Sequence, residues 1–319
     1  MCSRVRKQAN GVACKGISPA RSLTWALGLK RIFRNEIMAK KSTKSNNKGA
    51  LSIKNVTKVY DPTGVNVKAV DDCSMEIAGG EVCMIVGPSG CGKTTLLNAI
   101  AGFHSITEGS IHLDGDLLCG PSKPKAEQSA ERMVVFQHGA LFPWKTLQEN
   151  VAYGPTVQRV MAPAEALDKA GQMLAEAGLG QFISKYPGEV SSGMARRAEI
   201  VRALINDPKV LLLDEPYRAM DALTKQIMHE SLLETYDRTG VTIFFITHDL
   251  EEAIFLGDKV HVVTTRPCQL KKTVEVKIPR PRSYETQSSN EFRRLLEEVN
   301  DAVHEEAVKA FQAGEREMA

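Results

Sequence analysis

The feature that most constrains this chain is a glycine-rich run between a short apolar segment and a helical pattern. Residues 87–94, with the sequence GPSGCGKT, match the pattern GxxxxGK[ST] at every fixed position. The apolar residues Val82–Val86 before the run predict a buried strand, and Gly92–Ala101 predict a helix. A strand, a glycine-rich turn and a helix in this order predict a loop that wraps around phosphate groups.

Each residue type in this run suits the binding of a triphosphate. Glycines let the backbone come close enough for its N–H groups to cradle phosphates, and the helix that follows directs its positive end at them. The Lys93 ammonium can reach the β- and γ-phosphates, and the Thr94 hydroxyl can ligate Mg²⁺. We interpret Cys91 as an ordinary variable residue of the loop rather than a redox centre. The residues expected to contact the nucleotide here are Gly87, Pro88, Ser89, Gly90, Cys91, Gly92, Lys93, Thr94 and Thr95.

Beyond this run, strand and helix patterns alternate, which predicts an α/β fold with a mostly parallel sheet. We expect a nucleotide-binding domain over residues 49–280, an inserted helical subdomain at about 146–206, and a linker and helix over 281–319. The other strands are expected over Leu51–Thr57, Ala69–Ile77, Gly109–Leu113, Met133–Phe136, Val210–Leu213, Val241–Ile246 and Lys259–Thr264. The other helices are expected over Ala164–Ala177, Ser192–Ile205, Ala222–Tyr236, Leu250–Leu256 and Asn290–Lys309.

Two acids, Asp214 and Glu215, directly follow the apolar run at residues 210–213. Ligands of open α/β sheets lie at the carboxyl ends of the strands, so Asp214 is expected beside the phosphate loop, where it can hold Mg²⁺ directly or through water. Glu215 would then face the γ-phosphate and can act as general base toward an attacking water. Two acids that merely cap a strand are the weaker alternative, because buried unpaired carboxylates are costly.

Gln137 and His248 each follow another predicted strand. A histidine at a strand end is by itself more often structural than catalytic. Beside a phosphate loop and a glutamate, however, His248 becomes a candidate to contact the γ-phosphate and to orient the water. The Gln137 amide suits contact with Mg²⁺ and water, although this residue taken singly carries almost no signal.

The net charge of +3 conceals an uneven distribution. Residues 1–50 hold twelve Lys and Arg against one acid, Glu36, whereas the rest holds 29 Lys and Arg against 37 Asp and Glu. The mildly acidic body argues against a nucleic-acid partner. No apolar run approaches the roughly 18 residues of a membrane span, so action at a membrane would require a partner protein. The seven cysteines have no zinc-type spacing and fit reduced thiols in a cytosolic compartment.

Residues 1–48 are basic and poor in periodic apolar residues, which predicts a disordered tail. One interpretation is that this tail binds anionic lipid or an acidic partner. The other is that translation begins at Met38 and that the first 37 residues are an artefact of start-codon assignment. We favour the second interpretation.

The order of these features resembles that of the ATP-binding subunits of ABC transporters, over about residues 51–270. Residues 87–94 resemble Walker A, residues 210–215 resemble Walker B, and VSSGMARR at residues 190–197 resembles the ABC signature. The resemblance implies a P-loop NTPase core with an antiparallel β subdomain and an inserted α-helical subdomain. It implies Glu215, His248 and Lys93 as catalytic residues and Thr94, Gln137 and Asp214 as Mg²⁺ contacts. The further nucleotide contacts that it implies are Tyr60, Gln137, Ser191, Gly193, Met194 and Asp221.

Residues 136–144 and 149–154 are similar to the subgroup that powers bacterial uptake of nitrate, sulfonates and taurine. This likeness implies ATP hydrolysis with Mg²⁺, and a head-to-tail homodimer that holds two nucleotides. It also implies an integral membrane permease and, indirectly, a periplasmic solute-binding protein. The chain would then lie peripherally at the cytoplasmic face of the inner membrane. No residue of the chain would touch the solute, so the chain does not specify the solute chemically.

Two residues depart from the family pattern. Ser192 stands where the signature has its first glycine, and Arg218 stands where the segment before Asp221 has a glycine. If the backbone at Ser192 has a positive φ, the side chain costs about 1 kcal/mol or more. These departures suggest one alternative, a catalytically weakened or regulatory ABC ATPase. Another alternative, a non-transport ATPase that acts on DNA or ribosomes, would need a coiled-coil insertion or tandem nucleotide domains, which the sequence lacks.

Overall fold

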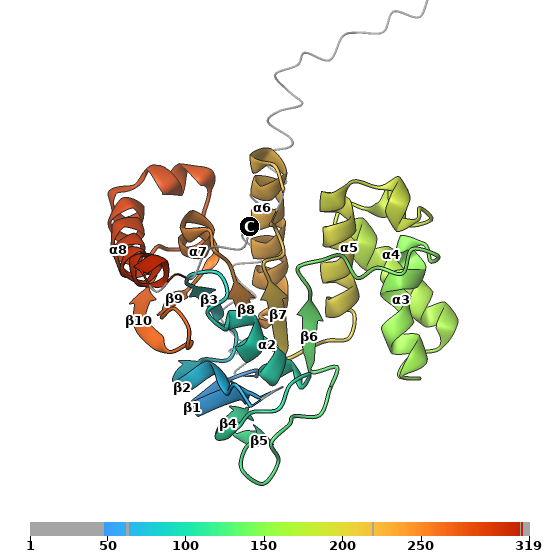
Figure 1. Cartoon of the computed structure of the whole chain (residues 1–319). Helices are drawn as coiled ribbons and strands as arrows, with labels where there is room; N and C mark the ends of the chain where they lie inside the picture. Colours follow the sequence, from blue (N-terminus) through green and yellow to red (C-terminus); the bar gives the residue numbers. More distant parts are fainter. Residues whose placement is uncertain (1–47, 62–63, 219, 313, 315–319) are drawn as a thin grey trace, which may run out of the picture. The chain divides into compact units, whose positions relative to one another are not determined.

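The computed structural model describes residues 48–61, 64–218, 220–312 and 314 of the chain. Apart from Lys48, the predicted basic tail and its Met38 start therefore lie outside the described residues. The described residues form two sheets and a set of helices around them (Figure 1).

The larger sheet has six strands in the order β10-β9-β3-β8-β7-β6. Five of these strands run parallel, and β10 pairs antiparallel with β9. Every residue of β3, β7 and β8 is buried, because helices or the second sheet cover both faces, and this accounts for their continuous apolar runs. The strands are β3 (Val82–Val86), β6 (Arg132–Val135), β7 (Val210–Asp214), β8 (Thr242–Ile246), β9 (Lys259–Val263) and β10 (Leu270–Glu275).

The two faces of this sheet belong to two separate hydrophobic cores. Successive side chains of a strand point to opposite faces. Met84 therefore lies in one core, whereas its neighbours Cys83 and Ile85 lie in the other. The Met84 face packs on helices α5 (Ser192–Leu204), α6 (Ala222–Thr239), α7 (Leu250–Leu256) and α8 (Asn290–Gln312). The opposite face packs on α2 (Lys93–Ala101) and on the smaller sheet.

The smaller sheet has four antiparallel strands in the order β2-β1-β4-β5. They are β1 (Leu51–Tyr60), β2 (Val67–Ile77), β4 (Glu108–Leu113) and β5 (Asp116–Cys119). Asp114 and Gly115 both have positive φ and form the tight turn between β4 and β5. The fold class predicted from the sequence is confirmed, including the antiparallel sheet.

Three helices, α3 (Leu147–Val157), α4 (Pro163–Glu176) and α5, enclose a third core between β6 and β7 in the sequence. Figure 1 shows them grouped to one side of α6. Thr146 and Glu149 form a capping box that fixes the start of α3. Two short 3₁₀ helices, Gly180–Phe182 and Pro187–Glu189, lead from α4 to α5.

The C-terminal segment returns to the large sheet after β10. The buried Arg282 guanidinium donates to the carbonyl oxygens of Ile254, Phe255 and Gly257, which satisfies the end of α7. A 3₁₀ helix, Tyr284–Ser288, then leads into α8, which packs on α7, β9 and β10. Within the part of the chain that the structure describes, no helix has both the length and the apolar character needed to cross a membrane.

Candidate functional site

The phosphate loop joins the end of β3 to α2, and two of its glycines leave no room for a side chain. Gly92 has a φ of +117°, and a Cβ there would lie 2.3 Å from the carbonyl oxygen of Ala69. A Cβ at Gly87 would lie 2.7 Å from Cγ2 of Val263. The backbone therefore packs directly against β2 and β9, and the amino end of α2 begins where the loop ends.

Lys93 is folded into its own loop and is only 6% exposed. Its ammonium donates to the carbonyl oxygens of Gly87 at 2.8 Å and Pro88 at 2.7 Å, and lies 3.6 Å from the Cys91 sulfur. A hydrogen bond with the Cys268 thiol, together with the Lys93 charge, lowers the pKa of Cys91 to about 6 despite its burial. A bound phosphate would replace these acceptors of the lysine.

Asp214, at the end of β7, faces the first turn of α2. Its Oδ1 accepts a hydrogen bond of 3.3 Å from the Thr94 hydroxyl. Burial raises the pKa of the Asp214 carboxyl, the Thr94 hydrogen bond opposes this shift, and the neighbouring Glu215 charge adds to it. A desolvated carboxylate beside a hydroxyl gains from a cation, and these oxygen ligands are the ones that Mg²⁺ prefers. The pair therefore fits a Mg²⁺ ion.

Glu215 is the point at which the ends of three strands meet. Its φ of +43° is unusual for a residue other than glycine. Its backbone N–H donates to the carbonyl oxygen of Ile246 at 3.0 Å. Its Oε2 lies 3.5 Å from Nδ1 of His248 and accepts from Nε2 of Gln137 at 3.5 Å. The Arg218 guanidinium reaches the same oxygen at 3.1 Å. Long contacts of this kind are typical of catalytic groups before substrate binds.

The structure thus brings a large part of the predicted site together at the carboxyl edge of the parallel sheet. The residues that meet there are Lys93, Thr94, Gln137, Asp214, Glu215 and His248. This edge is where an open α/β sheet binds its ligands. Their individual roles in chemistry stay predictions.

A second group of predicted residues lies at the starts of α5 and α6. The Ser191 hydroxyl caps α5 by accepting from the N–H of Met194 at 3.3 Å, and Asp221 caps α6 by accepting from the N–H of Thr224 at 2.9 Å. A Cβ at Gly193 would lie 2.7 Å from Cγ2 of Thr224, so the two helix starts are adjacent. None of these contacts reaches the phosphate loop.

The sequence singles out Tyr60 and Ser192 for different reasons. The Tyr60 hydroxyl forms a hydrogen bond of 2.8 Å with Nδ1 of His104, and the Lys58 ammonium lies 4.8 Å from the centroid of the Tyr60 ring. The contact of Tyr60 with a nucleotide stays a prediction. Ser192 is the first residue of α5 and does not have a positive φ. The strain considered for a serine at this position is therefore absent.

A buried ion pair that the sequence reasoning missed ties the Gln137 segment to α5. Arg196 donates to the carbonyl oxygens of Phe136 at 2.6 Å and Gln137 at 2.7 Å, and pairs with Glu199 at 2.6 Å. Glu199 in turn accepts from the N–H of Ala140 at 2.5 Å. A charged pair at a spacing of three on a helix is usually a solvated one, so the sequence offered no signal for this link.

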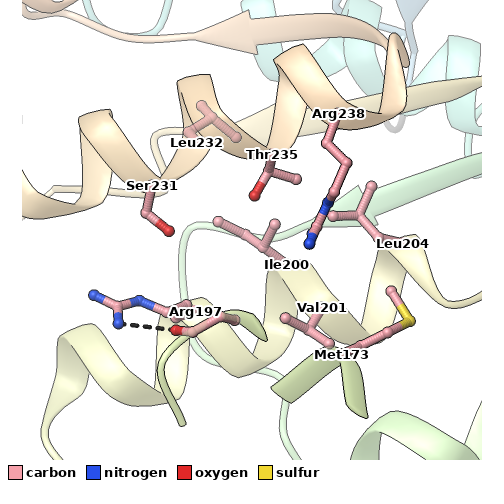
Figure 2. A pocket seen from close by; sticks show the side chains of 10 residues that line it. Met173, Arg197, Ile200, Val201, Leu204, Ser231, Leu232, Thr235 and Arg238 are labelled. Carbon is pink, nitrogen blue, oxygen red and sulfur yellow. Dashed lines mark hydrogen bonds between the residues drawn. The ribbon is translucent and has the colours of Figure 1, made fainter. Parts of the chain in front are cut away.

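Figure 2 shows a small hollow between α6 and the helices α4 and α5. Its volume of about 10 Å³ is enough for about one water molecule. The Arg197 guanidinium beside it donates to the carbonyl oxygen of Ala177 at 3.0 Å. This hollow is too small for a nucleotide and includes none of the phosphate-loop residues.

Comparison with known proteins agrees with this geometry. The family profile described as ABC transporter matches residues 70–218. The chain is 37% identical over 262 residues to an uncharacterized ABC transporter ATP-binding protein of Methanocaldococcus jannaschii, covering 82% of this chain and 94% of that protein. It is 42% identical over 230 residues to a taurine import ATP-binding protein of Jannaschia sp., covering 72% and 82%. It is 38% identical over 256 residues to a nitrate import ATP-binding protein of Synechocystis sp., covering 78% and 93%.

A solved structure has the same architecture. It is a dimeric post-hydrolysis state of an ATP-binding cassette bound to ADP and Pi, with a TM-score of 0.62 and 28% identity over 72% of this chain and all of that one. The chain belongs to the ATP-binding proteins of ABC transporters. It is a nucleotide-binding ATPase of that class.

Proposed function

We propose that this chain hydrolyses ATP to drive the import of a small anionic solute of the sulfonate, taurine or nitrate type. The observation that supports the ATPase part is the meeting of the phosphate loop with Asp214 and Glu215 at one sheet edge. The solute class comes from the likeness to taurine, aliphatic sulfonate and nitrate import ATP-binding proteins.

The chemistry is transfer of the γ-phosphoryl group from ATP to water. Glu215 accepts a proton from the attacking water, and His248, 3.5 Å from the glutamate, orients that water. Lys93 leaves its carbonyl acceptors and neutralises charge on the β- and γ-phosphates. Positioning and electrostatic stabilisation supply most of the rate enhancement in such a site.

Thr94, Asp214 and Gln137 would hold Mg²⁺, which when bound neutralises part of the phosphate charge. The Thr94 hydroxyl and the buried Asp214 carboxylate already lie within 3.3 Å of each other. The backbone of residues 87–95 surrounds the phosphates, and the Tyr60 ring stacks on the base.

A second copy of the chain completes the site. The exposed Ser191 and the adjacent Gly193 and Met194 belong to a helix start, and a helix start binds anions. In a two-fold arrangement each copy presents this segment, together with Asp221, to the nucleotide held by the phosphate loop of the other. Two nucleotides are then buried between two copies.

Exposed aromatic side chains in residues 136–144 and on α3 provide the surface for a membrane permease. Trp144 is 71% exposed, and Phe136 and Tyr153 are also exposed. The Arg196–Glu199 pair fixes this segment to α5, so movement at Gln137 is transmitted to the surface. Large exposed aromatics mark interaction sites. The chain would lie peripherally at the cytoplasmic face of the membrane, and a periplasmic solute-binding protein would act through the permease.

The test compares the wild-type protein with Glu215→Gln, using Glu297→Gln on the exposed face of α8 as a control. Glu215→Gln should bind ATP but turn over about 10²–10⁴-fold more slowly, because the general base is lost. Glu297→Gln should match the wild type. The wild-type protein, reconstituted in vesicles with its permease and solute-binding protein, should drive ATP-dependent uptake of taurine, an alkanesulfonate or nitrate. Turnover that survives Glu215→Gln, or no uptake of any of the three, would contradict the proposal.

A further inference from the structure

The backbone on the two sides of His248 is joined by one hydroxyl group. Thr247 and Asp249 flank His248, and the Thr247 hydroxyl accepts a hydrogen bond of 3.0 Å from the backbone N–H of Asp249. The same hydroxyl donates to Oε2 of Glu252 in the first turn of α7. The N–H of Glu252 donates in turn to Oδ1 of Asp249 at 3.1 Å. These three hydrogen bonds close the turn that carries His248.

Glu252 is buried, and its second oxygen is also bound. The side chain is 4% exposed, and its Oε1 forms a hydrogen bond of 2.7 Å with Nε2 of His229 on α6. Because a carboxylate oxygen accepts, Nε2 donates, which leaves Nδ1 of His229 facing the Tyr284 hydroxyl at 3.3 Å. The N–H of Thr247 donates to the carbonyl oxygen of Ile85 on β3 at 3.2 Å. The carboxylate and the turn are therefore fixed to α6 and to the large sheet.

The His248 side chain has few contacts of its own. It is 54% exposed, and within the described part of the chain its one hydrogen-bond or charge contact is the 3.5 Å approach of Nδ1 to Oε2 of Glu215. A ring with so few contacts takes its direction from its backbone. We propose that Thr247, held by Glu252, is a positioning residue that orients His248 toward the site of the attacking water. This inference rests on the role of His248 in the proposed function.

Loss of the Thr247 hydroxyl should slow the chemical step and leave ATP binding unchanged. The N–H of Asp249 and one oxygen of Glu252 would lose their partner, so the turn would rearrange and move the His248 ring. A displacement of about 1 Å can cost about 10²-fold in rate, and a ring that still reaches the correct position part of the time loses less, about tenfold. The phosphate loop takes part in none of these hydrogen bonds, so KM should not change.

The experiment measures ATP turnover by Thr247→Val, which keeps the shape of the side chain and removes its hydroxyl. Thr247→Val should lower kcat about tenfold with KM unchanged, and Thr247→Ser, which keeps the hydroxyl, should stay within about twofold of the wild type. The matched control is Thr242→Val at the start of β8, the strand that ends before Thr247. Thr242 is fully buried and its hydroxyl accepts from the N–H of Gly80 at 2.8 Å, so this variant should lower the melting temperature and leave kcat unchanged.

A double-mutant cycle with His248→Ala separates positioning from a general loss of structure. His248→Ala should lower turnover about 10²-fold, and adding Thr247→Val should then cost less than about a further twofold, because the ring that Thr247 orients is gone. If Thr247→Val does not fold, Thr247→Cys takes its place in the cycle, since a thiol is a weaker donor and acceptor than a hydroxyl. Thr247→Cys should lower kcat about threefold, and only when His248 is present.

An equal loss of turnover in the presence and in the absence of His248 would overturn the inference, and so would a Thr242→Val variant as slow as Thr247→Val. The cycle also distinguishes this inference from the proposed function. If His248→Ala leaves turnover unchanged, the role of His248 in the proposed function fails, and the positioning role fails with it. If His248→Ala slows turnover and the substitution at Thr247 does not, the positioning role alone fails.

Discussion

The two halves of the proposed nucleotide site are built differently. The phosphate loop is held by the core, since its glycines touch Ala69 and Val263 and its lysine is buried among its own carbonyl groups. The Ser191–Met194 segment lies at an exposed helix start whose side-chain bonds are satisfied within α5. The phosphate loop is therefore preorganised within one chain, whereas the Ser191–Met194 segment would contact a nucleotide only across a dimer with a second copy of the chain. Variants in the two halves should therefore fail in different ways.

Lys93→Ala should have the largest effect, because it removes the one side chain of the loop that carries a positive charge to the phosphates. We expect turnover to fall about 10²–10³-fold and ATP binding to weaken. Lys277→Ala, at an exposed lysine after β10, should match the wild type. Turnover is measured as phosphate release and binding by calorimetry. An Lys93→Ala protein that retains a tenth of the wild-type turnover would show that the loop does not act as proposed.

Glu199→Ala should break the link between the Gln137 segment and α5 and destabilise the fold by about 3–5 kcal/mol, since it leaves Arg196 buried without its partner. The double variant Arg196→Gln, Glu199→Ala removes both charges and should lose less folding stability than Glu199→Ala alone. Urea unfolding of the two variants and the wild type gives these free energies. A single variant as stable as the double variant would mean that the pair contributes nothing beyond its separate side chains.

The strand, loop and helix that carry the first half could be predicted from the sequence, because the pattern that specifies them lies within about 20 residues. A glycine-rich loop between a buried strand and a helix is a chemical pattern, and so are the two acids that end an apolar strand. The apolar runs of β3, β7 and β8 cross the interior and are buried on both faces. Their length and composition alone distinguish them from helices.

Other features could not be predicted because they arise from contacts distant in sequence. β5 and β10 are not predicted from the sequence. Only one residue of β5 and one of β10 is buried, and β5 has only four residues, so neither has an apolar pattern typical of a strand. The Arg196–Glu199 pair is buried only because residues 136–140 cross over it. The positive φ of Glu215 depends on its backbone bond to β8. Local pattern carries no information about any of these.

Gly193→Ala should damage the second half without touching the first. The added methyl group would lie 2.7 Å from Cγ2 of Thr224 and force the starts of α5 and α6 apart. Overpacking of this size costs about 1–3 kcal/mol of folding stability. The displaced Ser191–Met194 segment would no longer meet the partner's nucleotide correctly, so turnover should fall at least about tenfold while the phosphate loop keeps its affinity for ATP. Gly188→Ala is the control, because a Cβ there meets no atom within 4 Å. Loss of ATP binding by Gly193→Ala would show that the phosphate loop and the Ser191–Met194 segment do not act independently.

Mixing the two damaged proteins sharpens this comparison. A dimer of one Lys93→Ala chain and one Gly193→Ala chain keeps one intact site. The Gly193→Ala chain supplies the intact phosphate loop of that site, and the Lys93→Ala chain supplies the intact start of α5. An equal mixture should regain about a quarter of the wild-type sites. If the mixture is no faster than the average of its components, the two segments do not meet across a dimer.

ATP binding should also change the charge of the loop. The Cys91 thiol, with its pKa lowered to about 6, is largely ionised at neutral pH before binding. Phosphate charge nearby disfavours the thiolate and raises this pKa, so the complex takes up a fraction of a proton at pH values above about 6. Calorimetry in buffers of different ionisation enthalpy measures the uptake. Cys91→Ser should abolish it, whereas Cys83→Ser should not, because burial raises the pKa of the Cys83 thiol.

The smallest effect is expected for Ser192→Gly, which restores the glycine that the family resemblance predicts in the second half. Ser192 is the first residue of α5 and has no positive φ, so removing its side chain releases no backbone strain. Glycine costs a helix about 0.5–1 kcal/mol relative to alanine, which affects the stability of α5 more than the chemistry. We expect turnover within about twofold of the wild type and a slightly lower melting temperature. A tenfold gain in turnover would mean that the Ser192 side chain obstructs the partner's nucleotide, and that the second half is impaired in this chain.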